Sequence, residues 1–400
     1  MLQTLRKILP CRLPVLLLSI YILTIPFEAI LLMPTIKGIS FSTIVGILAL
    51  TIFALDIAVH QTKIRIPANV FPWLVIFLWI LLSTIWSINP IATLSAFWVC
   101  IRFLFFFLVL TMYEFRKEDL SIIKKSIILS GMIASIFVLI FYVQGNFSWV
   151  YRTTLSAGGN TADPNHLAAS LILPFAFQLG RLVVSKSKKP LDIVFLLLMF
   201  FAVIATGSRG GLLSIFAVML SMFLFYKPEG KENRAIFSII GLMSLALYFI
   251  LPYLSAGLVE RFLPNSDLNS FTAGRIELWR AGWIAWLKNP FLGYGFGNFF
   301  EVMASQSGIL FTAHNIYLQF LVEMGPFGLI FLLYTGVKSI WFKAKTSLGV
   351  SAKSGLIGLA VASFALGTFN YDYFWLIFIM IIIARNYEQN SFKVYFNGKE

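Results

Sequence analysis

The sequence predicts an all-α polytopic membrane protein. Of its 400 residues, 59% are hydrophobic and only 12% are charged, and the mean hydropathy is +0.87. Soluble domains contain about 45–50% apolar and about 25% charged residues. The composition therefore excludes an ordinary soluble globular domain.

Apolar runs recur along the whole chain. A run of roughly 17 to 25 apolar residues can cross the hydrocarbon core as a helix, which satisfies its own backbone hydrogen bonds there. We expect about twelve such helices, forming a single integral membrane domain over residues 1–400. The expected spans are approximately 13–33, 41–59, 70–87, 93–113, 120–143, 165–184, 190–206, 210–226, 235–255, 314–342, 353–369 and 372–385.

The net charge of +14 by itself would suggest a nucleic-acid partner, but the positions of the charges argue against one. Most of the 31 Lys and Arg residues fall in alternate connections between the expected spans. The positive-inside rule makes these connections cytoplasmic. We therefore expect a multi-pass protein with both termini in the cytoplasm and no nucleic-acid partner.

Two connections on the opposite, outer side are long, at about 144–164 and 256–313. The second joins the ninth and tenth spans and is expected to form one large extramembrane loop. Within it, RIELWRAGWIAWLKNP at 275–290 repeats Ile and Trp at helical spacing, which predicts a short amphipathic helix near the membrane interface. GYGFGNFF at 293–300 lacks the strand and helix of a nucleotide-binding fingerprint, so a flexible aromatic loop is expected.

The sixth expected span begins on the outer side with NTADPNHLAAS. Asp163 suits the N-cap position, and Pro164 suits the first helical position, where a missing N–H has no cost. Asn165 and His166 would then expose polar groups in the first turn. Capping alone is a sufficient explanation for Asp163.

The eighth expected span also begins outside, with TGSRGGLLS. Ser208 can cap the helix, and the flanking glycines allow a very tight hairpin. Arg209 adds a positive charge to the positive end of the helix dipole, so the turn favours an anion such as phosphate. An arginine that merely anchors the turn at the interface explains the residue equally well.

The tenth expected span begins with TAHN, where Thr312 is a candidate cap and His314 falls in the first turn. A helix N-terminus disfavours imidazolium and so lowers the pKa of a histidine there, which leaves a neutral ring able to accept a proton. A structural role is the usual explanation for a lone interfacial histidine; a neighbouring phosphate site favours catalysis.

Glu323 lies nine residues after His314 on the same expected helix. Nine residues correspond to half a turn out of phase and about 13.5 Å of rise, so Glu323 is a poor partner for the imidazole. An ionisable residue within a span is costly and for that reason a candidate functional residue. We keep it as a secondary candidate.

Several of these stretches together resemble one family. DPNHLA (163–168), GSRGG (207–211), TAGRIELW (272–279), NPFLGYGFGNF (289–299) and HNIYLQFLVEMGPFG (314–328) are similar to motifs of the bacterial O-antigen ligase and O-antigen polymerase superfamily. The resemblance covers roughly residues 160–330.

The resemblance implies a GT-C-like fold and an inverting, metal-independent glycosyltransferase without a cofactor, acting at the periplasmic face of the bacterial inner membrane. Its donor would be a glycan on undecaprenyl pyrophosphate. Matching the motifs assigns Arg209 and Arg275 to the pyrophosphate and His314 to catalysis. The secondary candidates are Asp163, Asn165, His166, Ser208, Asn315 and Glu323.

A ligase and a polymerase of this superfamily differ in the acceptor of the glycan. An O-antigen ligase transfers the glycan to lipid A-core, and this is the function we expect. An O-antigen or exopolysaccharide polymerase transfers it to another lipid-linked unit, and the rather short outer loop leaves room for this alternative. A transporter or flippase for lipid-linked sugars would place polar residues deep within several spans, whereas this chain concentrates them at one surface.

Overall fold

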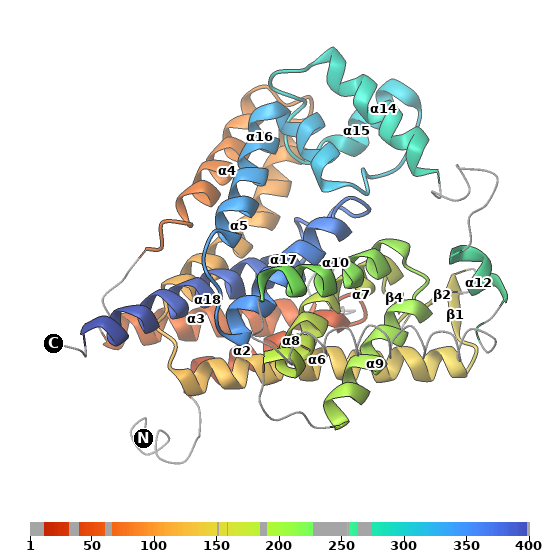
Figure 1. Cartoon of the computed structure of the whole chain (residues 1–400). Coiled ribbons are helices and arrows are strands. Elements are labelled where there is room, and N and C mark those ends of the chain that lie inside the picture. The colour runs from red at the N-terminus through yellow and green to blue at the C-terminus, as the bar shows by residue number, and fades with distance from the viewer. Residues whose placement is uncertain are drawn as a thin grey trace.

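The computed structural model describes residues 12–31, 40–60, 66–149, 152–157, 159–184, 190–226, 254, 256–262 and 274–397. This part of the chain is mostly helical (Figure 1). The expected span at 235–255 lies outside the described residues.

Within the described part, five helical segments are long and apolar enough to cross a membrane. They are α3 (Phe41–His60), α5 (Pro90–Met112), α6 (Lys117–Val143), α7 (Pro164–Ser170) continued by α8 (Ile172–Val184), and α16 (Ile316–Ile340). The shorter apolar helices are α2 (Leu13–Thr24) with the 3-10 turn η1 (Ile25–Phe27), α4 (Phe71–Leu82) with η2 (Ser83–Ile85), α9 (Pro190–Ala205), α10 (Arg209–Phe225) and α17 (Ser347–Ala362). The last helix, α18 (Asp372–Asn397), follows them.

The chain is not purely helical. Two small antiparallel sheets pair β1 (Phe147–Trp149) with β2 (Arg152–Thr153), and β3 (Ser156–Ala157) with β4 (Asn160–Thr161). This stretch is rich in Ser, Thr, Asn and Gly and lacks helical apolar periodicity, so local hairpin bonds satisfy its backbone instead.

Between α10 and α16, the described residues form α12 (Ala256–Phe262), α14 (Arg275–Lys288) and α15 (Phe299–Ser307). The helix expected at 275–290 is therefore confirmed as α14. Its buried face consists of Leu278, Gly282 and Ala285 rather than the repeated Ile and Trp positions. Ile276 and Trp283 are 41% and 50% exposed, whereas Trp279 and Trp286 are partly buried, so only part of the apolar stripe lies on the outer surface of α14.

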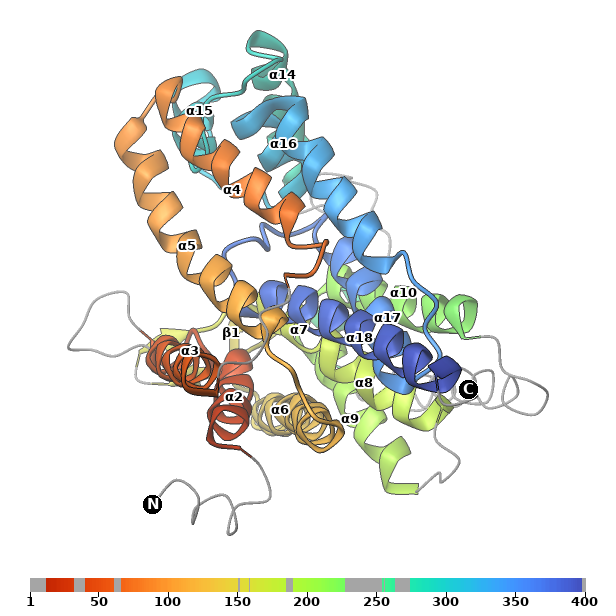
Figure 2. The ribbon, with the colours of Figure 1, turned by 90° about the vertical axis from the view of Figure 1, so that its left-hand side faces the viewer.

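The helices form two groups, which both views separate (Figures 1 and 2). One contains α4, α14, α15 and α16 with part of α5, and the other contains α2, α3, α6 to α10 and α17. In the second group small residues allow close approach: Gly358 of α17 faces Val218 of α10 and Ile172 of α8. Such packing is the usual means of association between apolar helices, since lipid and side chains are equally apolar.

Residues 363–371, which join α17 to α18, lie where the two groups meet. The ring of Phe369 packs against Trp73 of α4, Phe320 of α16 and Trp375 of α18. The indole N–H of Trp375 also donates to the Phe369 carbonyl at 2.8 Å. These contacts hold the connection in one place, and the site described below is built around it.

Candidate active site

The start of α7 forms as the sequence predicts. The Asp163 carboxylate caps the helix by accepting from the backbone N–H groups of Asn165 (2.6 Å) and His166 (3.4 Å), and Pro164 is the first helical residue. The expectation that Asn165 and His166 are exposed is wrong, since both are half-buried. Their neighbours come from outside the helix.

One of those neighbours is Arg152, which is only 6% exposed. Its Nη2 donates to the Asn165 side-chain oxygen at 2.7 Å, and its Nε donates to the Thr206 carbonyl at 2.9 Å. Arg152 therefore ties the start of α7 to the turn that precedes α10.

The turn before α10 is the tight hairpin that its glycines predict. Only three residues separate α9 from α10, and Gly207 has φ of 60°. The Ser208 hydroxyl caps α10 by accepting from the Gly211 N–H at 3.1 Å, which confirms the predicted cap. Arg209 is the first residue of α10 and is half-buried. Gly210 lies beside Ala365, so α10 begins next to the 363–371 connection.

The start of α16 is attached to the same connection. The backbone N–H of Ile316 donates to the carbonyls of Ser363 (3.0 Å) and Leu366 (3.1 Å). Asn315 caps α16, because its side-chain oxygen accepts from the N–H groups of Tyr317 and Leu318. His166, near the start of α7, contacts Tyr371 of the connection and Tyr373 of α18. The starts of α7, α10 and α16, which are far apart in sequence, are thus gathered around residues 363–373.

His314 itself precedes the helix, which corrects its expected place in the first turn and leaves Thr312 without a capping role. It is the one non-glycine residue of the described chain with positive φ, at 43°. Before His314, the Ala313 carbonyl accepts from the indole N–H of Trp279 in α14 at 3.2 Å. After it, Asn315 is the N-cap of α16. The backbone between these two anchors turns in the left-handed region, which an L-residue rarely adopts.

The electrostatics of His314 favour a neutral ring. Partial burial and the positive charge of Arg275 lower the pKa of His314 below its usual 6.5, and the Asp163 carboxylate opposes the shift. The direction of the shift is the one expected from the sequence, and burial and a neighbouring guanidinium are its main causes.

Arg275 is the first residue of α14, after Gly274 at φ of 73°. Its charge acts on both His314 and His166, as does that of Asp163. Four of the residues singled out from the sequence, Asp163, His166, Arg275 and His314, therefore belong to one electrostatic cluster.

Glu323 belongs to a different cluster. Its carboxylate accepts from the Phe299 N–H (3.0 Å) and the Gln319 side chain (3.3 Å), and its carbonyl accepts from the Gly295 N–H (2.8 Å). Glu323 is 1% exposed, so these bonds replace the water that a buried carboxyl group loses. The residue holds the 293–299 loop against α16.

That loop is not the flexible aromatic segment expected from its glycines. Tyr294, Phe296 and Asn298 are all at most 8% exposed. Asn298 donates to the hydroxyls of Ser87 and Thr93, which fixes the loop to the start of α5. α16 bends beside this loop at Gly325, where φ is 67° and Pro326 follows.

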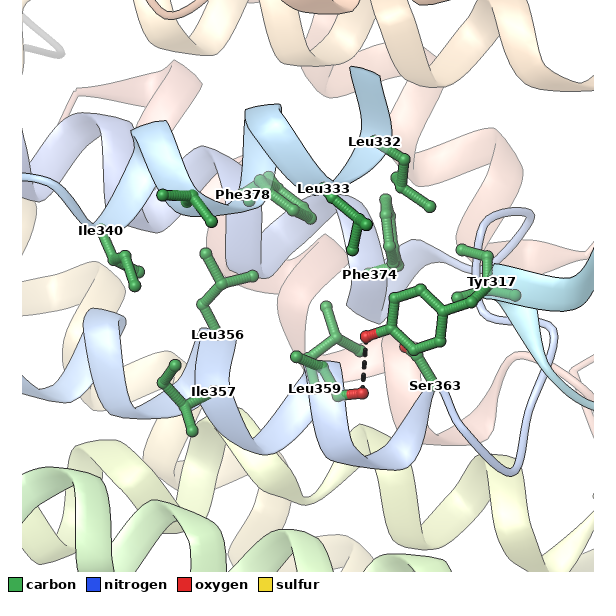
Figure 3. Close-up of a pocket in the computed structure, with 14 residues that line it drawn as sticks. Tyr317, Leu332, Leu333, Ile340, Leu356, Ile357, Leu359, Ser363, Phe374 and Phe378 are labelled. Carbon is green, nitrogen blue, oxygen red and sulfur yellow. Dashed lines mark hydrogen bonds between the residues drawn. The ribbon is translucent and has the colours of Figure 1, made fainter. Parts of the chain in front are cut away.

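An apolar cavity of about 160 Å³ lies between α16, α17 and α18. Tyr317 and Ser363 stand at one end of it and Ile340 at the other (Figure 3). The Tyr317 hydroxyl donates to the Ala360 carbonyl at 2.8 Å, which leaves the lining almost wholly hydrocarbon. Since Tyr317 is the second residue of α16, this end of the cavity lies near the start of that helix.

Sequence reasoning missed Arg152, Tyr371 and Tyr373. The two tyrosines contact His166, although more than 200 residues separate them in the chain. In the sequence they read as ordinary aromatic residues at the end of a span, and Arg152 as one of several outer basic residues. Among the described residues, no group of three or more His, Cys, Asp and Glu side chains is placed to hold a metal ion.

Comparison with known proteins supports the resemblance seen in the motifs. Residues 194–333 match the family described as O-antigen ligase. The chain is also 24% identical over 350 residues to the teichuronic acid biosynthesis protein TuaE of Bacillus subtilis (strain 168), an alignment that covers 79% of this chain and 71% of that protein. No solved structure matches significantly. The resemblance to the O-antigen ligase superfamily is thereby confirmed.

Proposed function

We propose that the chain is an O-antigen ligase, which transfers a glycan from undecaprenyl pyrophosphate to a sugar hydroxyl of lipid A-core. The observation that carries the proposal is the position of His314. This half-buried ring has its pKa lowered by burial and Arg275, and its backbone is held between the fixed residues Ala313 and Asn315. A neutral imidazole beside a guanidinium suits a reaction in which a hydroxyl attacks a carbon that carries a diphosphate.

In the proposed reaction, His314 accepts the proton of the acceptor hydroxyl as the oxygen attacks the anomeric carbon. The new glycosidic bond forms on the face opposite the diphosphate, so the configuration inverts. The bond to the diphosphate breaks, and its electron pair leaves with the lipid diphosphate. Arg209 and Arg275 bind this leaving group and stabilise its developing charge, without a requirement for a metal or cofactor.

The proposal includes the topology expected from the sequence, with about twelve spans and both termini in the cytoplasm of a bacterial inner membrane. Residues 256–313 then form a periplasmic loop, and the active site faces the periplasm. The clustering of Asp163, Arg275 and His314 supports this orientation, because the positive-inside rule assigns all three to the outer side.

The cavity between α16, α17 and α18 supports a lipid-linked donor. Its hydrocarbon lining suits an isoprenoid chain, and its end at Tyr317 and Ser363 lies next to the start of α16. A donor whose first isoprene units occupied this cavity would bring its diphosphate toward His314.

A polymerase that joins undecaprenyl-pyrophosphate-linked repeat units is the second candidate. The similarity to a protein named for teichuronic acid biosynthesis favours it, since that name concerns a polysaccharide other than O-antigen. Both functions use the same donor and the same proposed base. Only the acceptor differs.

The test uses the purified chain in lipid nanodiscs with a lipid-linked repeat unit as donor. A ligase forms product only when lipid A-core is added, whereas a polymerase lengthens the lipid-linked glycan without it. Loss of the donor from one leaflet without a new glycosidic bond would refute both functions and indicate a flippase.

A further inference from the structure

The ring of His166 is held from two directions by tyrosines of the 363–373 region. It stacks on Tyr371 with ring centroids 3.8 Å apart and 18° between the planes. Its Nδ1 lies 2.8 Å from the hydroxyl oxygen of Tyr373. Asp163 also bonds to the His166 backbone N–H, so both the backbone and the ring are restrained.

The Tyr373 contact selects one tautomer of His166. Tyr373 is 4% exposed, and within the described part of the chain its hydroxyl bonds to this ring. If Nδ1 carried the proton, the buried Tyr373 O–H would have no acceptor there, which is costly. With the proton on Nε2, Tyr373 donates to the Nδ1 lone pair and both groups are satisfied.

The selected tautomer presents a fixed N–H donor at Nε2. In the described part of the chain, the His166 ring bonds to another side chain through Nδ1, and Nε2 takes no part in that bond. His166 lies close enough to His314 and Arg275 to feel their charges. The cluster therefore contains two imidazoles with different environments, one set beside a guanidinium and one locked by a tyrosine hydroxyl.

We propose that His166 binds a phosphate oxygen of the lipid diphosphate through Nε2–H, with Tyr373 and Tyr371 as the residues that position it. This inference rests on the proposed transferase function and adds a substrate contact to it. A neutral N–H complements Arg275, because it donates to an anionic oxygen without further raising the positive charge around His314. An acceptor sugar hydroxyl is the other ligand that an N–H could bind, and the experiment separates the two.

The first measurement is binding of undecaprenyl diphosphate to the full chain in nanodiscs. His166→Phe should weaken binding by about 10- to 100-fold, as expected for a hydrogen bond to a charged group. His166→Gln retains an N–H donor and should stay within about tenfold of the wild type. Undecaprenyl monophosphate, which lacks the second phosphate, serves as the comparison ligand.

The second measurement tests the positioning role of Tyr373. Tyr373→Phe should weaken diphosphate binding by about 3- to 10-fold in the wild-type background, because Nδ1 loses the donor that selects the tautomer. In the His166→Phe background the same change should have no further effect. Tyr334→Phe is the control and should bind as the wild type does, since it removes a hydroxyl from a half-exposed tyrosine of α16 that does not contact His166.

Three outcomes would overturn the inference. An equal loss from Tyr373→Phe in both backgrounds would mean that this tyrosine is merely structural. Unchanged diphosphate binding with a raised KM for the acceptor in His166→Phe would assign the ring to the sugar. If the wild-type chain itself bound no lipid diphosphate and formed no product, the proposed function would fail as well, so the two failures are distinguishable.

Discussion

Replacing His314 by glycine should remove activity while relieving backbone strain. The residue has φ of 43°, in the left-handed region. That conformation costs an L-residue about 1–2 kcal/mol, whereas glycine adopts it freely but loses about 0.5–1 kcal/mol through the entropy of the unfolded chain. His314→Gly should therefore be about 0.5–1 kcal/mol more stable than His314→Ala, although both lack the imidazole.

Both variants should lose turnover by about 10²- to 10⁴-fold, the usual contribution of a general base. Activity is measured as product formed from the lipid-linked donor, and stability as the melting temperature in detergent, where the expected difference is about 1–2 °C. Gly308→Ala is the matched control. Gly308 has φ of 69°, and no heavy atom lies within 4 Å of where its Cβ would be, so alanine there should reproduce the backbone cost without loss of activity.

Two results would refute this reasoning. Turnover within about tenfold of the wild type in His314→Ala would exclude His314 as the base. A melting temperature for His314→Gly equal to or below that of His314→Ala would show that the left-handed backbone stores no strain. Strain of this kind at a functional residue is expected only where the surroundings over-determine the conformation.

The remaining predictions concern charge and the cavity. Activity should fall as the pH drops through the His314 pKa, because the protonated ring cannot accept a proton. Arg275→Gln removes a positive neighbour and should move this acidic limb to higher pH, whereas Asp163→Asn removes a negative neighbour and should move it to lower pH. If the acidic limb of the pH–activity profile lay at the same pH in the wild type and in both variants, the electrostatic cluster would be contradicted. Gly336→Phe should fill the cavity and weaken binding of undecaprenyl diphosphate by about tenfold, since nothing lies within 4 Å of a Cβ at this position. Ile330→Phe, at a position of α16 that is 61% exposed and outside the cavity, should bind as the wild type does, and equal binding by both variants would exclude the cavity as the lipid site.

The local features of the site were predictable from the sequence. Asp163, Ser208 and the hairpin around Gly207 were assigned correctly, because a cap or a tight turn involves residues only two or three positions apart. His314 was singled out for a similar reason, as a rare polar residue at the start of an apolar run. Its position before the cap is set by a local feature as well, since Asn315 accepts from the N–H groups of Tyr317 and Leu318; the prediction chose Thr312 as the cap in place of Asn315.

The hydrogen-bond partners of Glu323 were not predictable from the sequence pattern. Glu323 bonds to Gln319, Gly295 and Phe299 rather than to His314, although the phase argument that predicted a poor partner counted His314 as part of the helix that it precedes. Two of these partners, Gly295 and Phe299, belong to a loop whose glycines suggested flexibility. Burial of Tyr294 and Phe296 against other helices orders that loop, and no local rule contains this information.

The sequence by itself determined that this is a membrane protein, where its caps and turns lie, and which superfamily it resembles. These features depend on composition and on residues near one another in the chain. Only the tertiary structure placed Tyr373 on His166 and Arg152 on Asn165, because those contacts depend on which apolar helices pack together. Helices of similar hydropathy select their neighbours by the fit of small residues such as Gly358 and by aromatic packing such as that of Phe369. This fit depends on the shape of the packed helices, which the linear pattern of hydropathy does not contain.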